Sequence, residues 1–83
     1  MTNELNHETS MTYEFDRDDL NNRFTYHPPK DGQPERYIAI RDSARVFAGL
    51  ISGEVPNSRE KSLALTKLEE AVMWANAGIA RNE

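Results

Sequence analysis

Cysteine is absent from this 83-residue chain, and so are long apolar runs. Without cysteine, neither a disulfide nor a thiolate-bound metal can stabilise the small core that such a length allows. A domain of this size buries only about 60% of the surface that its unfolded chain exposes. Association between copies is the remaining common remedy, so we expect a homo-oligomer. No apolar run approaches the roughly 18 residues of a membrane span, and we expect a cytosolic protein with no membrane partner.

The residue patterns of enzyme and metal sites are missing as well. His7 and His27 lie far apart, and no serine has a histidine near it in the sequence. The four glycines are isolated and do not form a phosphate-cradling loop. We therefore expect a protein that is not an enzyme, with no catalytic residue, no metal ligand and no cofactor.

Charge is distributed unevenly along the chain. Residues 1–20 contain six Asp and Glu against one Arg, or −5, whereas residues 21–83 contain nine Lys and Arg against eight Asp and Glu, or +1. Affinity for long nucleic acids comes mainly from many phosphate contacts, so this balance argues against DNA and RNA as partners. A ligand with two or three phosphates needs only local positive charge and is compatible with it.

The chain divides into two segments of different character. Residues 1–13 are polar and lack periodicity, which predicts an acidic, flexible N-terminal segment. Residues 14–83 carry helical patterns and predict an all-α domain. Its first element is a short helix over residues 16–24, because Phe15, Leu20 and Phe24 form a partial apolar stripe.

A longer helix is predicted from Pro34 to Ser52. Asp31 suits its N-cap, proline is tolerated in its first turn, and Gly53 suits its C-cap. Apolar residues spaced by three and four form one row on this helix, which comprises Tyr37, Ile40, Ala44, Phe47 and Ile51.

The last predicted helix spans residues 58–83, with Asn57 and Glu60 as a pair resembling a capping box. Its apolar row comprises Leu65, Leu68, Val72, Ala75 and Ile79. Because only a short loop separates the two longer helices, we expect them to fold back on each other as a long antiparallel hairpin.

Further apolar residues lie outside these two rows, and a lone hairpin would expose them. They are Ile38, Val46, Leu50, Leu63, Met73 and Trp74. Ala64, Ala71 and Gly78 also recur every seven residues, a stripe that permits close approach of another helix. Contiguous exposed apolar patches usually mark interfaces, so these faces favour association between copies. The alternative is that the short N-terminal helix covers them.

The loop between the first two helices has an unusual composition. Tyr26 and His27 precede two consecutive prolines, which keep the backbone extended and stiff, and Lys30 follows. An aromatic face beside a fixed positive charge suits stacking on a nucleobase while a phosphate is neutralised. The alternative is that Tyr26 and Pro28 pack on the hairpin while Lys30 is solvated.

Arginines supply the other candidate binding groups. Arg41 and Arg45 are one helical turn apart, with the Ser43 hydroxyl between them, and could grip a phosphate together. Alternatively they are solvated or paired with nearby carboxylates. Arg81 lies near the end of the last helix, where a cation also complements the helix dipole.

The segments FTYHPPKDGQPERYIAIRDSA and LALTKLEEAVMWANAGIARNE together resemble a family of small phage proteins, the anti-CBASS cyclic-oligonucleotide sponges. Their helical-hairpin domain is shared with the anti-Thoeris sponges. The resemblance extends over residues 16–83 and combines an unusual loop with a long, distinctive helix.

This resemblance implies a function and a set of site residues. Such sponges sequester cyclic dinucleotides, cGAMP among them, and cyclic trinucleotides without cleaving them, so that host immune effectors in the cytoplasm of the infected bacterium stay inactive. It implies a homohexamer with ligands between paired protomers. Tyr26 would stack on bases and Arg41 would hold phosphates, with His27 and Ser43 as their neighbours. Arg81 is assigned to a separate trinucleotide pocket.

The sequence leaves two other functions open. A helical module could bind a host protein through its apolar face, or a phosphodiesterase could degrade the signal, which the missing metal ligands oppose. Cyclic ADP-ribose ligands, typical of the anti-Thoeris branch, stay open. The absence of an additional domain favours the anti-CBASS branch.

Overall fold

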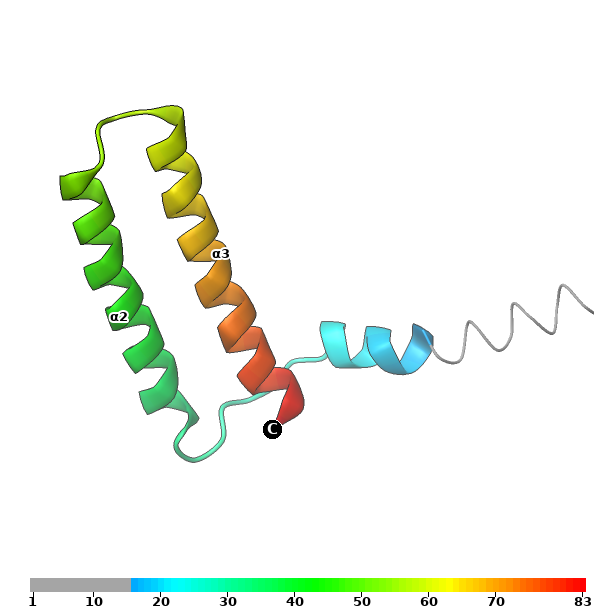
Figure 1. Ribbon diagram of the computed structural model, residues 1–83. Coiled ribbons are helices and arrows are strands. Elements are labelled where there is room, and N and C mark those ends of the chain that lie inside the picture. Colours follow the sequence, from blue (N-terminus) through cyan, green and yellow to red (C-terminus); the bar gives the residue numbers. More distant parts are fainter. Residues whose placement is uncertain (1–15) are drawn as a thin grey trace, which may run out of the picture.

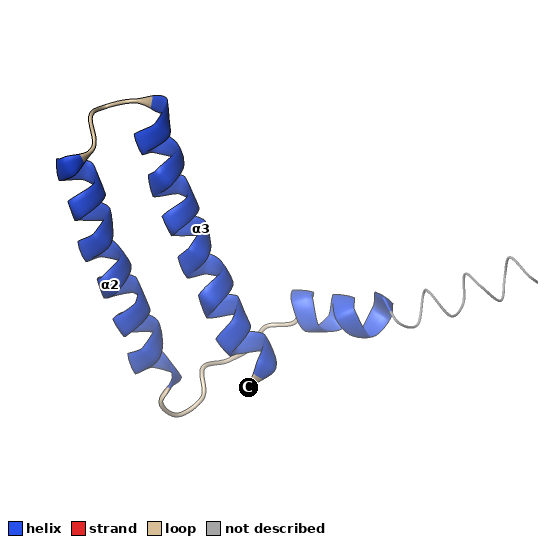
Figure 2. Ribbon diagram, in the orientation of Figure 1, coloured by secondary structure: helices blue, strands red, loops and turns tan. Residues whose placement is uncertain are grey.

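The computed structural model describes residues 16–83, which form helices joined by loops and contain no strand (Figure 1). A short helix occupies residues 16–24, α2 spans Gln33–Glu54 and α3 spans Arg59–Asn82. The two long helices run antiparallel (Figure 2). The predicted short helix and hairpin are therefore confirmed, whereas the segment 1–13 lies outside the described residues.

Both ends of α2 differ from the prediction. Its N-cap is Gly32, not Asp31, with a φ of 83° and no side-chain cap, and Pro34 lies in the first turn as expected. The helix also runs through Gly53 to Glu54, and the Val55 N–H donates to the Ile51 carbonyl at 3.0 Å. Gly53 lies inside the helix and does not have a positive φ. The C-cap is Val55, whose backbone is extended, so no left-handed glycine is needed at this end.

The start of α3 is shifted by one residue. Ser58, not Asn57, is the N-cap, and its hydroxyl accepts a hydrogen bond from the Lys61 N–H at 3.1 Å. The Lys61 ammonium donates to the Ser52 carbonyl at 2.6 Å and to the Asn57 side chain at 3.0 Å. The Asn57 side chain thus stabilises the turn between the helices, and Ser58 is the residue that caps α3.

The contact between α2 and α3 follows the predicted rows in part. Ile40, Ala44 and Ile51 on α2, like Leu65, Leu68, Val72 and Ile79 on α3, are half-buried. Phe47 and Ala75 are exposed, and Ala48 and Asn76 take their places in the rows. Spacings that alternate strictly between three and four residues average 3.5 residues per turn, whereas an α-helix has 3.6, so such a row drifts around the helix. The residues that face the partner helix therefore include two successive steps of four, at 40, 44 and 48 on α2 and at 68, 72 and 76 on α3.

Most large apolar side chains remain exposed. No hydrophobic residue of the described chain is fully buried, and Val46, Met73 and Trp74 are 75%, 64% and 63% exposed. The short N-terminal helix projects away from the hairpin (Figure 1), with Phe24 81% exposed, so it does not cover these faces. None of the described helices is long and apolar enough to cross a membrane.

Candidate functional site

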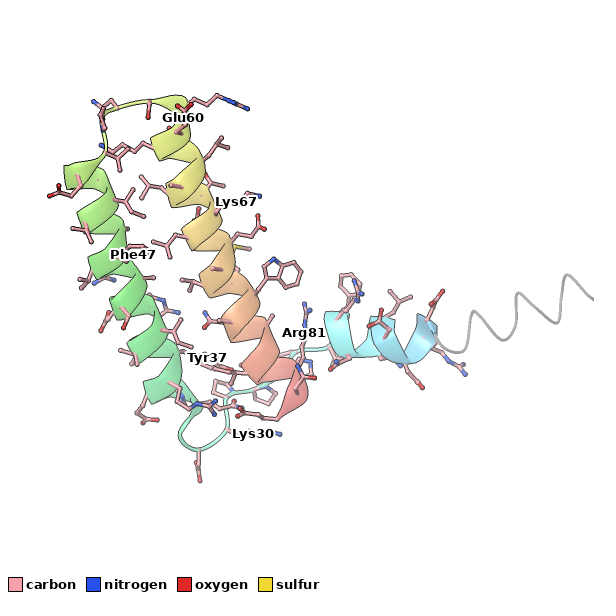
Figure 3. The ribbon with its side chains drawn as sticks, viewed as in Figure 1. Lys30, Tyr37, Phe47, Glu60, Lys67 and Arg81 are labelled. Atoms are coloured by element: carbon pink, nitrogen blue, oxygen red, sulfur yellow. The ribbon has the colours of Figure 1, made fainter. Side chains whose placement is uncertain are left out.

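A cavity of about 390 Å³ lies where the loop after the first helix crosses the hairpin. Ligand pockets are typically about 300–1,000 Å³, so its size suits a small molecule. Tyr37 and Arg81 mark this end of the hairpin, close to Lys30 (Figure 3). The residues that line it are Arg23, Thr25, Tyr26, His27, Tyr37, Arg41, Asn76, Ala77, Ala80 and Arg81.

The loop presents its two aromatic residues differently. His27 is half-buried, and its Nε2 lies 2.8 Å from the carbonyl oxygen of Asn22. Because a carbonyl can only accept, Nε2 carries the proton, and this bond ties the loop to the last turn of the short helix. Tyr26, by contrast, is 79% exposed. Its ring is therefore available for stacking.

A tight turn joins the loop to α2. The Gln33 N–H donates to the Lys30 carbonyl at 3.0 Å, and Gly32 has a φ of 83° and a ψ of −14°. A positive φ at the third position is the geometry of a type II turn, which strongly favours glycine there. The sequence Lys-Asp-Gly-Gln therefore sets the angle at which the loop reaches the hairpin.

Polar contacts connect this turn to the end of α3. The Lys30 ammonium donates to the Glu83 carbonyl oxygen, and Arg36 forms an ion pair with the Glu83 carboxylate at 2.8 Å. The hydrogen bond from Arg36, followed by one from Gln33, holds the pKa of Glu83 below its usual value. The same contact raises the pKa of Arg36. The Lys30 ammonium therefore already has a hydrogen-bond acceptor within the protein.

The electrostatic character of the cavity is positive. Three arginines line it and no carboxylate does. Arg23 pairs with Asp19 at 2.8 Å, but neither Arg41 nor Arg81 forms an ion pair within residues 16–83. Two guanidinium groups that form no ion pair among these residues, beside the exposed ring of Tyr26, can hold an anion and stack on a planar group.

A known protein family matches most of the chain. The family described as Acb2/Tad1, hairpin domain, matches residues 16–80. The chain belongs to this family. It is the family of the anti-CBASS and anti-Thoeris sponges, so membership implies a binding protein of the sponge type. Searches of curated proteins and of solved structures found no match.

The Acb2/Tad1 hairpin match contains nearly the whole candidate site. Every lining residue from Arg23 to Ala80 falls within it, and Arg81 is the next residue. Four of the residues singled out in the sequence meet in this one cavity. They are Tyr26, His27, Arg41 and Arg81. Arg81, which the resemblance assigns to a separate pocket, shares the cavity with Tyr26 in the single chain.

The remaining sequence candidates lie elsewhere. Ser43 lines an apolar groove of about 500 Å³ on one face of the hairpin. Arg45 lines a groove of about 620 Å³ on another face, which Arg41 also borders, and lies 3.9 Å from Asp42. Since Arg45 has a nearby carboxylate and Lys30 is bonded to Glu83, both have partners within the fold.

Six of the ten lining residues were not candidate site residues in the sequence, and three of these six, Arg23, Tyr37 and Asn76, bear on the site. Arg23 belongs to the short helix, on which the sequence indicated only an apolar stripe. Tyr37 was predicted to belong to the apolar row that contacts the other helix of the hairpin. Asn76 takes the row position predicted for Ala75, and its buried Oδ1 has no hydrogen-bond partner in the described chain. Arginine and tyrosine are residue types that suit a nucleotide site, but the sequence does not show that Arg23 and Tyr37 lie in one cavity, because this depends on the path of the loop.

Proposed function

We propose that this chain binds and sequesters cyclic di- and trinucleotide second messengers without cleaving them. Acting in the cytoplasm of the infected bacterium, it would keep the effectors of the host CBASS system inactive. Tyr26 stacks on a base, Arg41 holds a phosphate and His27 orients the loop. Arg81 serves larger cyclic ligands. Lys30, Ser43 and Arg45 are assigned secondary parts, since their side chains lie outside the cavity or are already bonded.

One observation carries the proposal. Among residues 16–83, the cavity combines an exposed tyrosine with two arginines that form no ion pair, and no carboxylate lines it. A cyclic dinucleotide carries two phosphates and two flat bases, which require these two kinds of group. A hydrogen bond to a charged group contributes about 1.5–3 kcal/mol, and stacking contributes about 1–3 kcal/mol per base.

Assembly is the second part of the proposal. We propose a homo-oligomer, a hexamer by analogy with the family, in which cyclic dinucleotides bind between paired protomers. A two-fold interface presents the same groups twice, and this matches a ligand built from two similar halves. The exposed apolar faces of α2 and α3 support association, because a single hairpin leaves them in water.

A ligand-depletion experiment tests this function. The purified protein is incubated with cGAMP or a cyclic triadenylate, the free ligand is measured, and the protein is then denatured by heat. A sponge depletes the ligand and releases it intact on heating. Recovery of a linear product would indicate an enzyme, and no depletion would contradict the binding proposal.

A second candidate function rests on the apolar groove of α2 and α3, which a host protein could occupy. This function predicts no depletion of cyclic nucleotides and a stable complex with a purified effector or cyclase. Calorimetry with the nucleotide panel therefore separates the two functions, and it also tests cyclic ADP-ribose ligands.

A further inference from the structure

Gln33 is unusual because it is polar and yet the one buried residue of the described chain. Its exposed fraction is 3%, whereas even the apolar rows of the hairpin are only half-buried. Buried polar groups are costly unless they are hydrogen-bonded. Such a residue at the start of α2 therefore needs a structural reason.

The side chain of Gln33 joins three separate parts of the chain. Its Oε1 accepts hydrogen bonds from the Lys30 N–H at 2.9 Å and, at 3.5 Å, from the Tyr37 hydroxyl. Its Nε2 donates to the Glu83 carboxylate at 3.2 Å. One amide thus connects the loop, the first turns of α2 and the end of α3.

These three parts are the ones that build the candidate cavity. Lys30 ends the stiff stretch that carries Tyr26 and His27, and Tyr37 is itself a lining residue. Arg81 lies two residues before Glu83. Each contact of Gln33 is therefore a lining residue or lies within three residues of one in the sequence, although Gln33 itself does not line the cavity.

We infer that Gln33 is a positioning residue for the candidate site. It orders the loop in the free protein, so that Tyr26 and His27 already face Arg41 and Arg81 when a ligand arrives. If the binding-competent arrangement is only partly populated, the apparent affinity falls by that fraction. The inference rests on the proposed function for its ligand, but the ordering of the loop can be measured without one.

The test compares Gln33→Met with Gln33→Glu. Methionine keeps the length of the side chain and removes both polar atoms, so it releases the loop and α3 together. Glutamate still accepts from the Lys30 N–H and the Tyr37 hydroxyl, but it opposes the Glu83 carboxylate and so releases α3 alone. Glu35→Gln, an exposed position in the first turn of α2, is the matched control.

Hydrogen exchange of the ligand-free variants gives the first result. In Gln33→Met, the loop peptide over residues 26–33 should exchange at least tenfold faster while the middle of α2 and α3 keeps its protection. In Gln33→Glu, the end of α3 should lose protection and the loop should keep it. Unchanged protection of the loop in Gln33→Met would overturn the inference. If Gln33→Met does not fold, equal loss of protection in both segments of Gln33→Glu would do the same.

Binding of cGAMP gives the second result. Gln33→Met should weaken affinity about tenfold or more, mainly through a slower association rate, because fewer molecules hold the loop ready. Gln33→Glu keeps the loop but releases the end of α3 that carries Arg81, so it should weaken affinity less than Gln33→Met does, whereas Glu35→Gln should stay within about threefold of the parent. Parental affinity in Gln33→Met would contradict the positioning role. If the parent itself binds no cyclic nucleotide, the proposed function fails, and the exchange result still decides whether Gln33 orders the loop.

Discussion

Two regions of the hairpin differ in the side chains that they expose. Around the start of α2, polar side chains are linked into a network, and the cavity beside it displays arginines without counter-charges. Along the middle of the hairpin, one groove is lined almost entirely by apolar residues, and large apolar side chains are exposed. The first region exposes positive charge and a tyrosine ring, whereas the second exposes apolar side chains.

This difference separates ligand binding from assembly. Polar, pre-ordered groups provide specificity for a charged small molecule, because their orientation is fixed before binding. Apolar faces provide area for another protein surface and have little preference for orientation. Substitutions in one region should therefore affect binding, and substitutions in the other should affect association.

The largest effect is expected from Ala71→Glu. Ala71 lines the apolar groove, so association there would bury an unpaired carboxylate. Burying a neutral polar group without a partner already costs about 2–7 kcal/mol, and a charge costs more. Sedimentation velocity should show loss of the oligomer. Thr66→Glu, an exposed position on the same helix outside the cavities described above, is the control and should assemble normally.

Tyr26→Ala should have the next largest effect, on binding alone. If each of two copies stacks one base, about 2–6 kcal/mol of binding free energy is at stake. That loss corresponds to a dissociation constant larger by about 30-fold to more than 10,000-fold. Tyr26→Phe keeps the ring and should retain most of the affinity. Calorimetric affinity equal to the parent's in Tyr26→Ala would remove the residue from the site.

Arg41→Ala should weaken binding by about 1.5–3 kcal/mol for each copy that holds a phosphate, the contribution of a hydrogen bond to a charged group. Arg41→Lys should restore only part of it, since lysine lacks the planar fork of the guanidinium. Arg59→Ala removes the same charge at the opposite end of the hairpin and should bind normally. Equal losses in Arg41→Ala and Arg59→Ala would mean that only net charge matters.

A smaller effect is expected from Gly32→Ala, because alanine at a φ of 83° is strained. The left-handed region costs an L-residue roughly 1–2 kcal/mol, which thermal unfolding should detect as lost stability. Gly53→Ala is the control within α2, where helical glycine costs about 0.5–1 kcal/mol relative to alanine. The control should therefore be stabilised, and destabilisation of both variants would contradict this reading of the turn.

The smallest effect is expected from protonation of Glu83. Its pKa is depressed mainly by the hydrogen bond from Arg36, so its contribution to stability is present above the ordinary value of 4.5. That contribution is lost as the pH falls from this value through the lower pKa of the folded protein. The stability difference between parent and Glu83→Gln should shrink over this acidic range. A difference that is constant with pH would exclude the ion pair as its cause.

Much of the fold follows from local patterns in the sequence. The spacing of apolar residues predicted all three helices, and the short loop predicted their antiparallel pairing. The caps were less predictable, since Ser58 and Asn57 are both good capping residues and the choice depends on where Lys61 reaches across the turn. Phe47 and Ala75 were misplaced because a row of contacts depends on the partner helix as well as on periodicity.

The candidate site shows the same division. Residue types made Tyr26, His27 and Arg41 candidates, because stacking rings and guanidinium groups are the chemistry that a nucleotide requires, and the family resemblance gave Tyr26 and Arg41 their roles and added Arg81. Their meeting in one cavity could not be read from spacing, since they come from a loop and two helices. Arg45 and Lys30 looked equally suitable in sequence, but in the fold they lie against Asp42 and Glu83.

The sequence by itself determined the helices, the stiff loop and the excess of apolar surface, because these depend on neighbours within a few residues. Only the tertiary structure decided which cations are left without partners and which polar residue is buried. Gln33 reads in the sequence as an ordinary helix entry, yet its amide joins three segments from both halves of the domain. Burial and charge pairing depend on contacts between distant residues, and those arise only when the hairpin closes and the loop crosses its end.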